Sequence, residues 1–320
     1  MGKVLVSASH FDTLCKEAWE LLTANGHEVI YDSGRAFPAY SFEELKEMIG
    51  DIDAALIGMD KYTEEVFQLA PKLKAVAKFG VGVDNIDGIA AKKYGIKVLN
   101  APGQNSNAVA EMCLAFILDL LRRITPLHGE VLQGKWPRFV GAELKGKTVG
   151  LLGFGAISKL VARKLLAFEA EVIAFDLYTD VAKAGALAVE AVTLADLLAR
   201  SDILSLHIPA TSETRHMFND ETFAKMKPGA FLINTARGAL VDTDALVRAL
   251  HTGQIAGAAI DAFEPEPLPP DSPILRCENV ILTPHTGAET VESYQNVSLT
   301  TARDIIAVLR GDEPLHCTNR

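Results

Sequence analysis

The chain has 320 residues, enough for two domains of ordinary size. Hydrophobic residues make up 49% and charged residues 22%, which is typical of a globular protein and excludes disordered, collagen-like and coiled-coil architectures. Lys and Arg total 31 against 41 for Asp and Glu, and the net charge of −10 argues against nucleic acid or an anionic membrane as a partner.

The first hundred residues alternate short apolar runs with amphipathic segments. Strands are expected at Lys3–Ala8, Glu28–Tyr31, Ala54–Gly58, Lys74–Phe79 and Lys97–Asn100, and helices at Thr13–Asn25, Phe42–Ile49, Glu64–Leu69 and Ile86–Tyr94. The strand runs are almost continuously apolar, as in strands buried on both faces of a parallel sheet. The sequence therefore predicts a five-stranded α/β unit with helices on both faces.

A long amphipathic helix is expected next, capped by Asn105 or Ser106 and running through Leu121. The stretch Thr125–Lys145 contains several Gly residues and no clear period, so it is predicted to be an arm or linker without regular structure. A second α/β series then follows, with strands and helices expected at Thr148–Leu152, Ala156–Phe168, Glu171–Asp176, Leu194–Ala199, Ile203–His207, Asp220–Met226, Ala230–Thr235, Asp244–Leu250, Ala256–Asp261 and Val280–Leu282.

These patterns predict an α/β protein with two doubly wound parallel-sheet domains. The last helix, about Glu289 to Arg310, has no strand after it, so we expect it to pack back on the first domain. The first domain would then comprise residues 1–100 plus 289–320, and the second residues 101–288 with an arm at about 123–147.

Nothing in the sequence predicts a membrane anchor or a metal site. The apolar stretches are far shorter than the roughly 20 residues of a spanning helix, and the first residues lead directly into a predicted strand without the pattern of a leader peptide. The four cysteines are widely spaced and form no C-x-x-C pair, which favours free thiols. We therefore expect a cytoplasmic protein without bound metal.

A glycine-rich loop lies between the predicted strand Thr148–Leu152 and the helix that follows it. Gly153 would permit a tight turn, and Gly155 would let the backbone approach a pyrophosphate at the helix N-terminus. Ser158 stands where the third glycine of this pattern is usual, at a packing position. Asp176 ends a strand about 20 residues later, where an acid can bond ribose hydroxyls, and the next residues offer no cation for a 2′-phosphate. The loop therefore predicts NAD rather than NADP, with a simple turn and a capping acid as the alternative interpretation.

Three other strand ends carry side chains suited to acid–base and carboxylate chemistry. Arg237 offers a planar fork for a carboxylate, and His285 can exchange a proton near neutral pH. Glu264 and Glu266 compete as the acid that would orient the histidine and favour its protonated form. His207 ends the strand Ile203–Leu206, where it either lines a cofactor cleft or has a structural role.

Taken together, the motifs resemble the D-isomer-specific 2-hydroxyacid dehydrogenase family, in particular its phosphoglycerate dehydrogenase-like branch. The resemblance covers essentially the whole chain. It rests on five signatures in order: Lys78–Asp87, Asn100–Gly103 leading to Glu111, Gly150–Ser158, Met226–Gly238 and Pro284–Ala288.

The resemblance implies two domains, a flavodoxin-like substrate domain and a Rossmann NAD-binding domain. It implies that Arg237 binds the substrate carboxylate, that His285 is the acid/base, and that Glu266, placed by a D-x-F-x-x-E-P pattern, is its partner. NAD contacts are implied at Gly153, Gly155, Ala156, Ile157, Asp176, His207, Ile208, Thr235, Ala236, Asp261, His285, Gly287 and Ala288. Substrate contacts are implied at Lys78, Val81, Gly82, Val83, Arg237 and His285.

The same resemblance implies a homodimer held by the second domain and the arm, with Trp136 in the interface. The substrate would be a D-2-hydroxy acid or its 2-oxo acid, with 3-phosphoglycerate, glycerate or hydroxypyruvate, and glyoxylate all open. The arginines that usually bind a phosphate in this branch are absent from Leu56–Lys61. A phosphorylated substrate would need other cations in their place, namely Arg35, Lys61, Lys78, or Lys135 and Arg138 of a partner subunit.

Two other functions are weighed against this one. A formate dehydrogenase is disfavoured because that branch usually has glutamine where Glu266 stands. A non-catalytic NADH-sensing corepressor stays open, since such relatives can retain Arg237, Glu266 and His285. Reduction of a 2-oxo acid by NADH distinguishes the enzyme from the corepressor.

Overall fold

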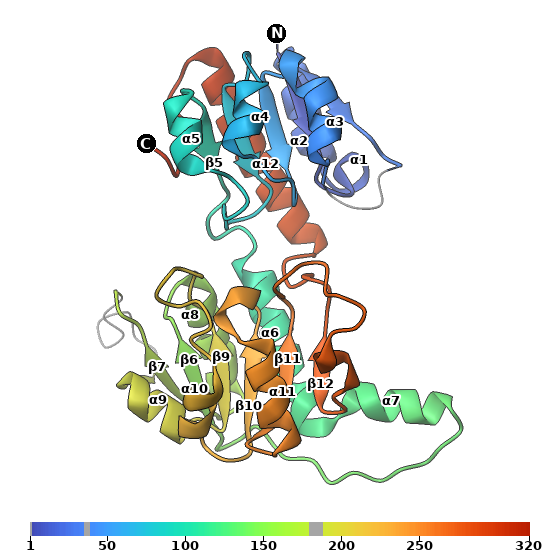
Figure 1. The fold of residues 1–320 in the computed structure, drawn as a ribbon, viewed down its shortest axis with the longest axis vertical. Helices are drawn as coiled ribbons and strands as arrows, with labels where there is room; N and C mark the ends of the chain where they lie inside the picture. The colour runs from blue at the N-terminus through green and yellow to red at the C-terminus, as the bar shows by residue number, and fades with distance from the viewer. Residues whose placement is uncertain (1, 35–38, 179–187) are drawn as a thin grey trace. The chain divides into compact units, whose positions relative to one another are not determined.

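The computed structural model describes residues 2–34, 39–178 and 188–320. The chain divides into two compact units, Met1–Asn105 with Ala288–Arg320, and Ser106–Gly287 (Figure 1). Both are parallel α/β units, which confirms the predicted fold class.

The first unit contains a five-stranded parallel sheet in the order β2-β1-β3-β4-β5. Its strands are β1 (Lys3–Val6), β2 (Glu28–Tyr31), β3 (Ala54–Ile57), β4 (Ala75–Lys78) and β5 (Lys97–Leu99). Its helices are α1 (Phe11–Leu14), α2 (Lys16–Ala24), α3 (Phe42–Met48), α4 (Glu64–Gln68), α5 (Gly88–Lys93) and α12 (Val291–Arg310), with a 3-10 turn at Ile49–Asp51.

Alternate residues of these strands supply two separate apolar layers. Val4 and Val6 pack on one face with α2 and α12, whereas Leu5 faces α3, α4 and α5 on the other. This alternation explains why the strand sequences are apolar throughout. The last helix of the chain therefore belongs to the first unit.

The helix expected at Thr13–Asn25 is divided into α1 and α2. Cys15 lies between them with φ −112° and ψ 31°, outside the helical region, and its buried thiol donates to the Tyr294 carbonyl at 3.6 Å. This contact with α12 is tertiary, so the local hydrophobic period could not reveal the break.

The second unit contains a seven-stranded parallel sheet in the order β12-β11-β10-β9-β6-β7-β8. Its strands are β6 (Thr148–Leu152), β7 (Glu171–Phe175), β8 (Val189–Ala191), β9 (Ile203–Leu206), β10 (Ala230–Asn234), β11 (Ile255–Ile260) and β12 (Val280–Leu282). Its helices are α6 (Ser106–Arg122), α7 (Ile124–Leu132), α8 (Ala156–Ala167), α9 (Leu194–Arg200), α10 (Asp220–Lys225) and α11 (Thr243–His251), with 3-10 turns at Gly238–Leu240 and Pro273–Arg276.

Helices α6 and α8 cover one face of this sheet, and α9, α10 and α11 cover the other. The direction of strand addition reverses between β6 and β9, because β7 lies on one side of β6 and β9 on the other. In doubly wound folds this switch point, at the carboxyl ends of the strands, is where ligands bind.

The stretch Thr125–Lys145, predicted to lack regular structure, begins with the helix α7. Arg123 (φ 51°) precedes the helix, and the Asp119 carboxylate accepts from the Thr125 amide at 2.8 Å in its first turn. Gly129 lies in the middle of the helix, and none of the residues of α7 is buried within the chain. The helix could not be predicted from the sequence because it contains a glycine and has no buried face to give a hydrophobic period. The strand β8 was also not predicted, because it is three residues long and Glu190 interrupts its apolar pattern.

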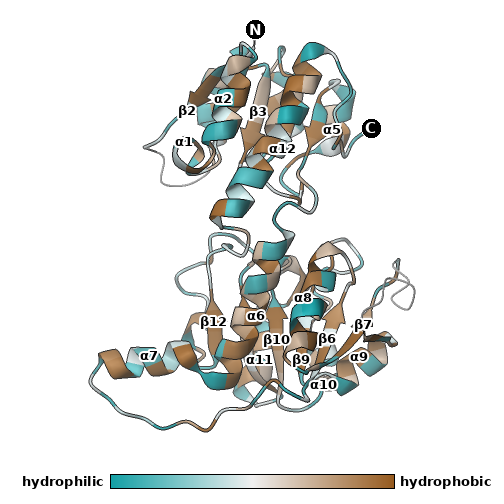
Figure 2. Ribbon diagram, turned by 180° about the vertical axis from the view of Figure 1, so that it is seen from behind, coloured by the Kyte–Doolittle hydropathy of each residue, from teal (hydrophilic) through white to brown (hydrophobic). Residues whose placement is uncertain are grey.

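Hydropathy follows the layering of the two units (Figure 2). The sheets are predominantly hydrophobic, whereas helices such as α2, α8 and α12 carry polar residues on part of their surface. Helix α7 shows hydrophobic residues toward both ends and polar ones between them, and it buries none of its residues. Among the described residues, no helix combines the length and the apolar character needed to cross a membrane.

Candidate active site

The glycine loop joins β6 to α8 at the switch point. Gly153 has φ +92°, and a Cβ there would lie 2.6 Å from the His207 carbonyl oxygen and 2.9 Å from the Ile208 side chain. A Cβ at Gly155, in contrast, would meet no atom within 4 Å, so space remains in front of the helix. Gly155 is the N-cap of α8, and no side chain caps this end of the helix. The loop thus leaves amide groups and open space where an anionic group can approach.

Asp176 directly follows β7 and holds the glycine loop. One carboxylate oxygen accepts from the Phe154 amide at 2.6 Å, and the other accepts from the Tyr178 amide at 2.7 Å. Ser158, at the third position of the glycine pattern, is fully buried in α8. The predicted phosphate and ribose elements are therefore adjacent in the second unit. Leu177, Tyr178 and Thr179 are the residues after Asp176 that offer no cation, and Thr179 lies outside the described residues.

The residues present fit a dinucleotide. The Thr235 hydroxyl oxygen, at the carboxyl end of β10, is buried and has no hydrogen-bond partner within the described residues. A buried hydroxyl normally has a hydrogen-bond partner, so a bound ligand would supply the one that this hydroxyl lacks. The open space at Gly155, at the same edge of the sheet, leaves room for such a ligand. NAD would be held here by Gly153, Gly155 and Asp176, and it would supply the hydride-carrying nicotinamide.

Arg237 is presented by a loop that a buried amide shapes. The Asn234 side chain, fully buried at the end of β10, donates to the Arg237 carbonyl at 2.9 Å and accepts from the Ala236 amide at 3.1 Å. The Arg237 guanidinium donates to the Ala236 carbonyl at 2.8 Å. Asn234 therefore fixes the turn from which Arg237 projects. Sequence reasoning did not identify this role, although an asparagine at a strand end next to small residues is typical of side-chain-capped turns.

Asp261 fixes the loop that carries His285. It is buried at the end of β11, and its carboxylate accepts from the Thr283 hydroxyl at 2.5 Å and from the amides of Thr286 and Gly287, both at 2.8 Å. A Cβ at Gly287 would lie 2.8 Å from this carboxylate. His285 itself has φ 56°. These bonds hold the histidine in a backbone conformation that few residues other than glycine adopt. This anchoring role of Asp261 was not predicted.

His285 and Glu266 form a hydrogen-bonded pair of ionisable side chains. The imidazole Nδ1 lies 2.9 Å and 3.1 Å from the two Glu266 carboxylate oxygens, and the Phe263 amide donates to Glu266 at 2.8 Å. Glu266 is largely enclosed, whereas the histidine side chain is 43% exposed. Nδ1 thus faces the carboxylate, which leaves Nε2 as the nitrogen available to a substrate.

The pKa of Glu266 is lowered from its ordinary value. Burial of the carboxyl group raises it, but the hydrogen bonds from His285 and from the Phe263 amide, with the positive charge of Arg237, outweigh burial. Glu266 is therefore ionised at neutral pH, and its carboxylate contacts the His285 ring. The influence of Arg237 indicates that the three predicted catalytic residues belong to one electrostatic environment.

The competing acid, Glu264, has different partners. It accepts from Arg215 at 2.6 Å, and its other oxygen lies 3.4 Å from the His216 ring. Glu264 thus ties the loop after β11 to the segment before α10, while Glu266 alone of the two reaches His285. The sequence alone did not show which of the two glutamates is the partner of His285.

Replacing Glu266 with Gln should lower turnover by at least about tenfold at neutral pH, because the substituted amide no longer stabilises the protonated imidazole. The folded-state pKa of Glu266 is depressed, so its carboxylate persists above that pKa and is lost as the pH falls through it. The ratio of wild-type to variant turnover should accordingly be largest near neutrality and shrink in acid below the ordinary glutamate range. A pH–rate profile of both proteins checks this, and a constant ratio would contradict it.

The substrate contacts predicted in the first unit lie at the carboxyl end of its sheet. Lys78 ends β4 and its ammonium group donates to the Gly58 carbonyl. The next segment is held by the Asn100 amide, which donates to the Val81 carbonyl at 2.8 Å, while Gly82 and Val83 are half-buried. Ala288, a predicted NAD contact, begins the second segment of this unit. Arg35 lies outside the described residues.

Ala156 and Ile157 open α8, and Ile208 and Ala236 follow β9 and β10, so the remaining predicted NAD contacts of the second unit lie at the same strand edge. His207 is the first residue after β9.

Lys135 and Arg138, the cations that a partner subunit would offer to a phosphate, are exposed in the segment after α7.

Comparison with known proteins identifies the family. The model of the D-isomer specific 2-hydroxyacid dehydrogenase NAD-binding domain matches residues 114–287. A glyoxylate reductase of Thermofilum pendens is 43% identical over 302 residues, covering 92% of this chain and 88% of the relative.

A D-3-phosphoglycerate dehydrogenase of Archaeoglobus fulgidus is 39% identical over 312 residues, and this chain spans 58% of its length. The apo-structure of D-lactate dehydrogenase from Escherichia coli superimposes with a TM-score of 0.86 at 29% identity over 99% of both chains. The chain therefore belongs to the D-isomer-specific 2-hydroxyacid dehydrogenases, NAD-dependent oxidoreductases built from two parallel α/β units.

Proposed function

We propose that this protein reduces a small, unphosphorylated 2-oxo acid, of the glyoxylate or hydroxypyruvate type, to the D-2-hydroxy acid in the cytoplasm. The observation that carries the proposal is the His285–Glu266 pair, at 2.9 Å, in the field of Arg237. This arrangement supplies a proton donor and a carboxylate-binding cation, which are the two groups that a 2-oxo acid requires.

Each of the three side chains has a distinct role in this proposal. Arg237 binds the substrate carboxylate and orients the adjacent carbonyl group. His285 donates the proton from Nε2 to the carbonyl oxygen, and in the oxidising direction it accepts the proton back. Glu266 contacts Nδ1, so it orients the ring and stabilises the charged form. Bound NADH supplies the hydride that the C2 atom of the substrate receives.

The substrate preference rests on the cations of the first unit. Met59 follows Gly58 in the segment where relatives that bind a phosphate usually have arginine, and the Lys78 ammonium group is bonded to the Gly58 carbonyl. Lys61 is the one cation of Leu56–Lys61, so this segment offers a doubly charged phosphate less positive charge than the arginines of those relatives would. The 43% identity to a glyoxylate reductase over most of its length supports the same choice.

NADH oxidation with a panel of 2-oxo acids tests this proposal. Glyoxylate and hydroxypyruvate should be reduced with a higher kcat/KM than 3-phosphohydroxypyruvate, and NADPH should be a poor substitute for NADH because Asp176 would repel its 2′-phosphate. A preference for 3-phosphohydroxypyruvate would favour the second candidate, a phosphoglycerate dehydrogenase, which the relatives with that name support. Binding of NADH without reduction of any acid would favour the corepressor-like function.

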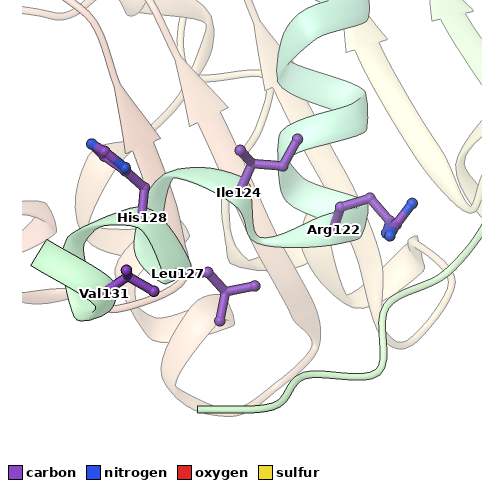
Figure 3. A pocket seen from close by; sticks show the side chains of 5 residues that line it. All are labelled: Arg122, Ile124, Leu127, His128 and Val131. Atoms are coloured by element: carbon purple, nitrogen blue, oxygen red, sulfur yellow. The ribbon is translucent and has the colours of Figure 1, made fainter. Parts of the chain in front are cut away.

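We further propose that two copies of this chain associate through the arm. Arg122, Ile124, Leu127, His128 and Val131 line a surface pocket on the end of α6 and on α7 (Figure 3). The arm carries further exposed apolar side chains: Leu132 is 75% exposed, Trp136 80% and Val140 94%. Several large apolar side chains exposed on one segment are typical of a protein–protein interface.

Replacing Leu132 and Val140 together with Asp should convert the dimer into a monomer at micromolar concentration, because burying two carboxylates without partners is costly. Sedimentation velocity measures the change. Ile89→Asp is the matched control, since Ile89 is 88% exposed on α5 and outside the arm. A wild-type protein that sediments as a monomer would contradict the proposed dimer.

A further inference from the structure

His207 is placed where the direction of strand addition reverses. It follows β9, the neighbour of β6, and its amide donates to the Leu152 carbonyl at 2.8 Å. Its own carbonyl oxygen lies 2.6 Å from the position that a Cβ on Gly153 would occupy. His207 therefore lies against the first glycine of the loop, at the crevice where a dinucleotide binds in this architecture.

A chain of hydrogen bonds runs from the core of the second unit to this histidine. The His207 Nε2 atom lies 2.9 Å from the Ser205 hydroxyl, and that hydroxyl lies 3.2 Å from the Cys113 sulfur on α6. Ser205 and Cys113 are both fully buried. Ser205 lies in β9 and His207 directly after it, and the bond between them shows that the two side chains lie on the same side of the chain.

The chemistry of these groups decides the direction in which protons are donated. Burial raises the pKa of the Cys113 thiol to about 11, so the sulfur carries its hydrogen at neutral pH. A thiol sulfur is a weak acceptor, whereas the lone pair of a neutral imidazole is a strong one. The thiol therefore donates to the Ser205 oxygen, and the Ser205 hydroxyl donates to Nε2 of His207.

This direction determines the tautomer of the histidine. Burial lowers the pKa of His207 to about 4, so the ring is neutral at pH 7 and carries one hydrogen. With Nε2 accepting from Ser205, the hydrogen is on Nδ1. Within the described residues the ring is hydrogen-bonded through Nε2, no bond to Nδ1 is seen, and the side chain is half-buried. Nδ1 is thus an oriented donor that the protein itself does not use.

We infer that the Cys113–Ser205–His207 chain holds His207 as the Nδ1–H tautomer so that it donates a hydrogen bond to an oxygen of the bound dinucleotide. Ser205 and Cys113 are then positioning residues, and His207 is the contact. The inference rests on the proposed dehydrogenase function and adds to it two core residues that touch neither the substrate nor the cofactor.

NADH affinity, measured by fluorescence titration of the full chain, tests this inference. Ser205→Ala should raise the Kd for NADH by about three- to tenfold, the usual effect of one misdirected hydrogen bond. Ser201→Ala is the matched control, because Ser201 is an equally buried serine just before β9, bonded to the Leu197 carbonyl at 2.5 Å. It should leave the Kd unchanged.

Two further comparisons separate positioning from packing. In the His207→Asn variant, the side-chain amide nitrogen takes roughly the place of Nδ1. An asparagine amide has no tautomers, so Ser205 has no tautomer to select. Adding Ser205→Ala to this variant should therefore have little further effect on the Kd for NADH. Cys113→Ser and Cys113→Ala both reduce the side-chain volume, but only serine retains a donor. Cys113→Ser should bind NADH as the wild type does, and Cys113→Ala more weakly.

Three results would overturn the inference. In the first, Ser205→Ala binds NADH with wild-type affinity. In the second, it weakens binding no more than Ser201→Ala does. In the third, Ser205→Ala has the same effect in the His207→Asn background as alone. A wild-type chain that does not bind NADH would overturn the proposed function as well, so that failure is distinguishable from the other three.

Discussion

Replacing His285 with Ala is expected to lower turnover by about 10²–10⁴-fold and to change the Kd for NADH far less, because the other implied NAD contacts remain. The imidazole is the only group in the described site placed to donate a proton while a neighbouring carboxylate stabilises its charge. The glycine loop and Asp176, on which dinucleotide binding is proposed to depend, make no contact with His285 within the described residues. Steady-state kinetics and a fluorescence titration with NADH provide the two measurements.

A second histidine variant is the control for this experiment. His251→Ala removes an exposed imidazole at the end of α11, where no catalytic role is proposed, and it should retain full activity. Near-normal turnover of the His285→Ala protein would eliminate His285 as the acid/base. Loss of NADH binding in that variant would show that the histidine acts mainly through the cofactor.

The second large effect is expected from Gly238→Ala. A Cβ at this position would lie 2.0 Å from the Phe263 carbonyl carbon and 2.5 Å from the Glu264 amide nitrogen. Both are backbone atoms, so the loop after β11 has to move, and Glu266 moves with it because the Phe263 amide holds its carboxylate at 2.8 Å. We expect turnover to fall by about 10²-fold, as is usual for a misplacement near 1 Å, and the unfolding free energy to drop by about 1–3 kcal/mol.

Urea unfolding and steady-state kinetics of the Gly238→Ala variant measure both effects. Gly88→Ala is the matched control, because a Cβ on Gly88, at the start of α5, would meet no atom within 4 Å. This control should retain both its stability and its activity. A Gly238→Ala protein with normal turnover would contradict the proposal that the position of Glu266 governs the reaction.

The strands of both sheets could be predicted because they are buried on both faces. Runs such as Ala54–Gly58 are apolar at every position, and this pattern depends only on the local sequence. The break at Cys15 and the helix α7 could not be predicted in the same way. The first is fixed by a contact with Tyr294, which lies far away in the sequence, and the second buries none of its residues.

The candidate site was predictable to a different extent. Arg237 and His285 follow strands, so their place at a sheet edge could be inferred from strand order alone. The choice between Glu264 and Glu266 depends on which carboxylate turns toward the histidine, and only the three-dimensional loop shows this. The anchoring bonds of Asp261 likewise join residues more than 20 positions apart.

We expect this chain to transfer a hydride from the nicotinamide of NADH to the C2 atom of a 2-oxo acid. Reaction of hydroxypyruvate with NADH that is deuterated at both C4 positions tests it directly, with mass spectrometry of the product. We predict D-glycerate with one deuterium at C2 from the wild type and essentially none from the His285→Ala variant in the same time. Tight binding of the labelled NADH, with no deuterium transferred to hydroxypyruvate, glyoxylate or any other acid of the panel, would contradict the proposed dehydrogenase function.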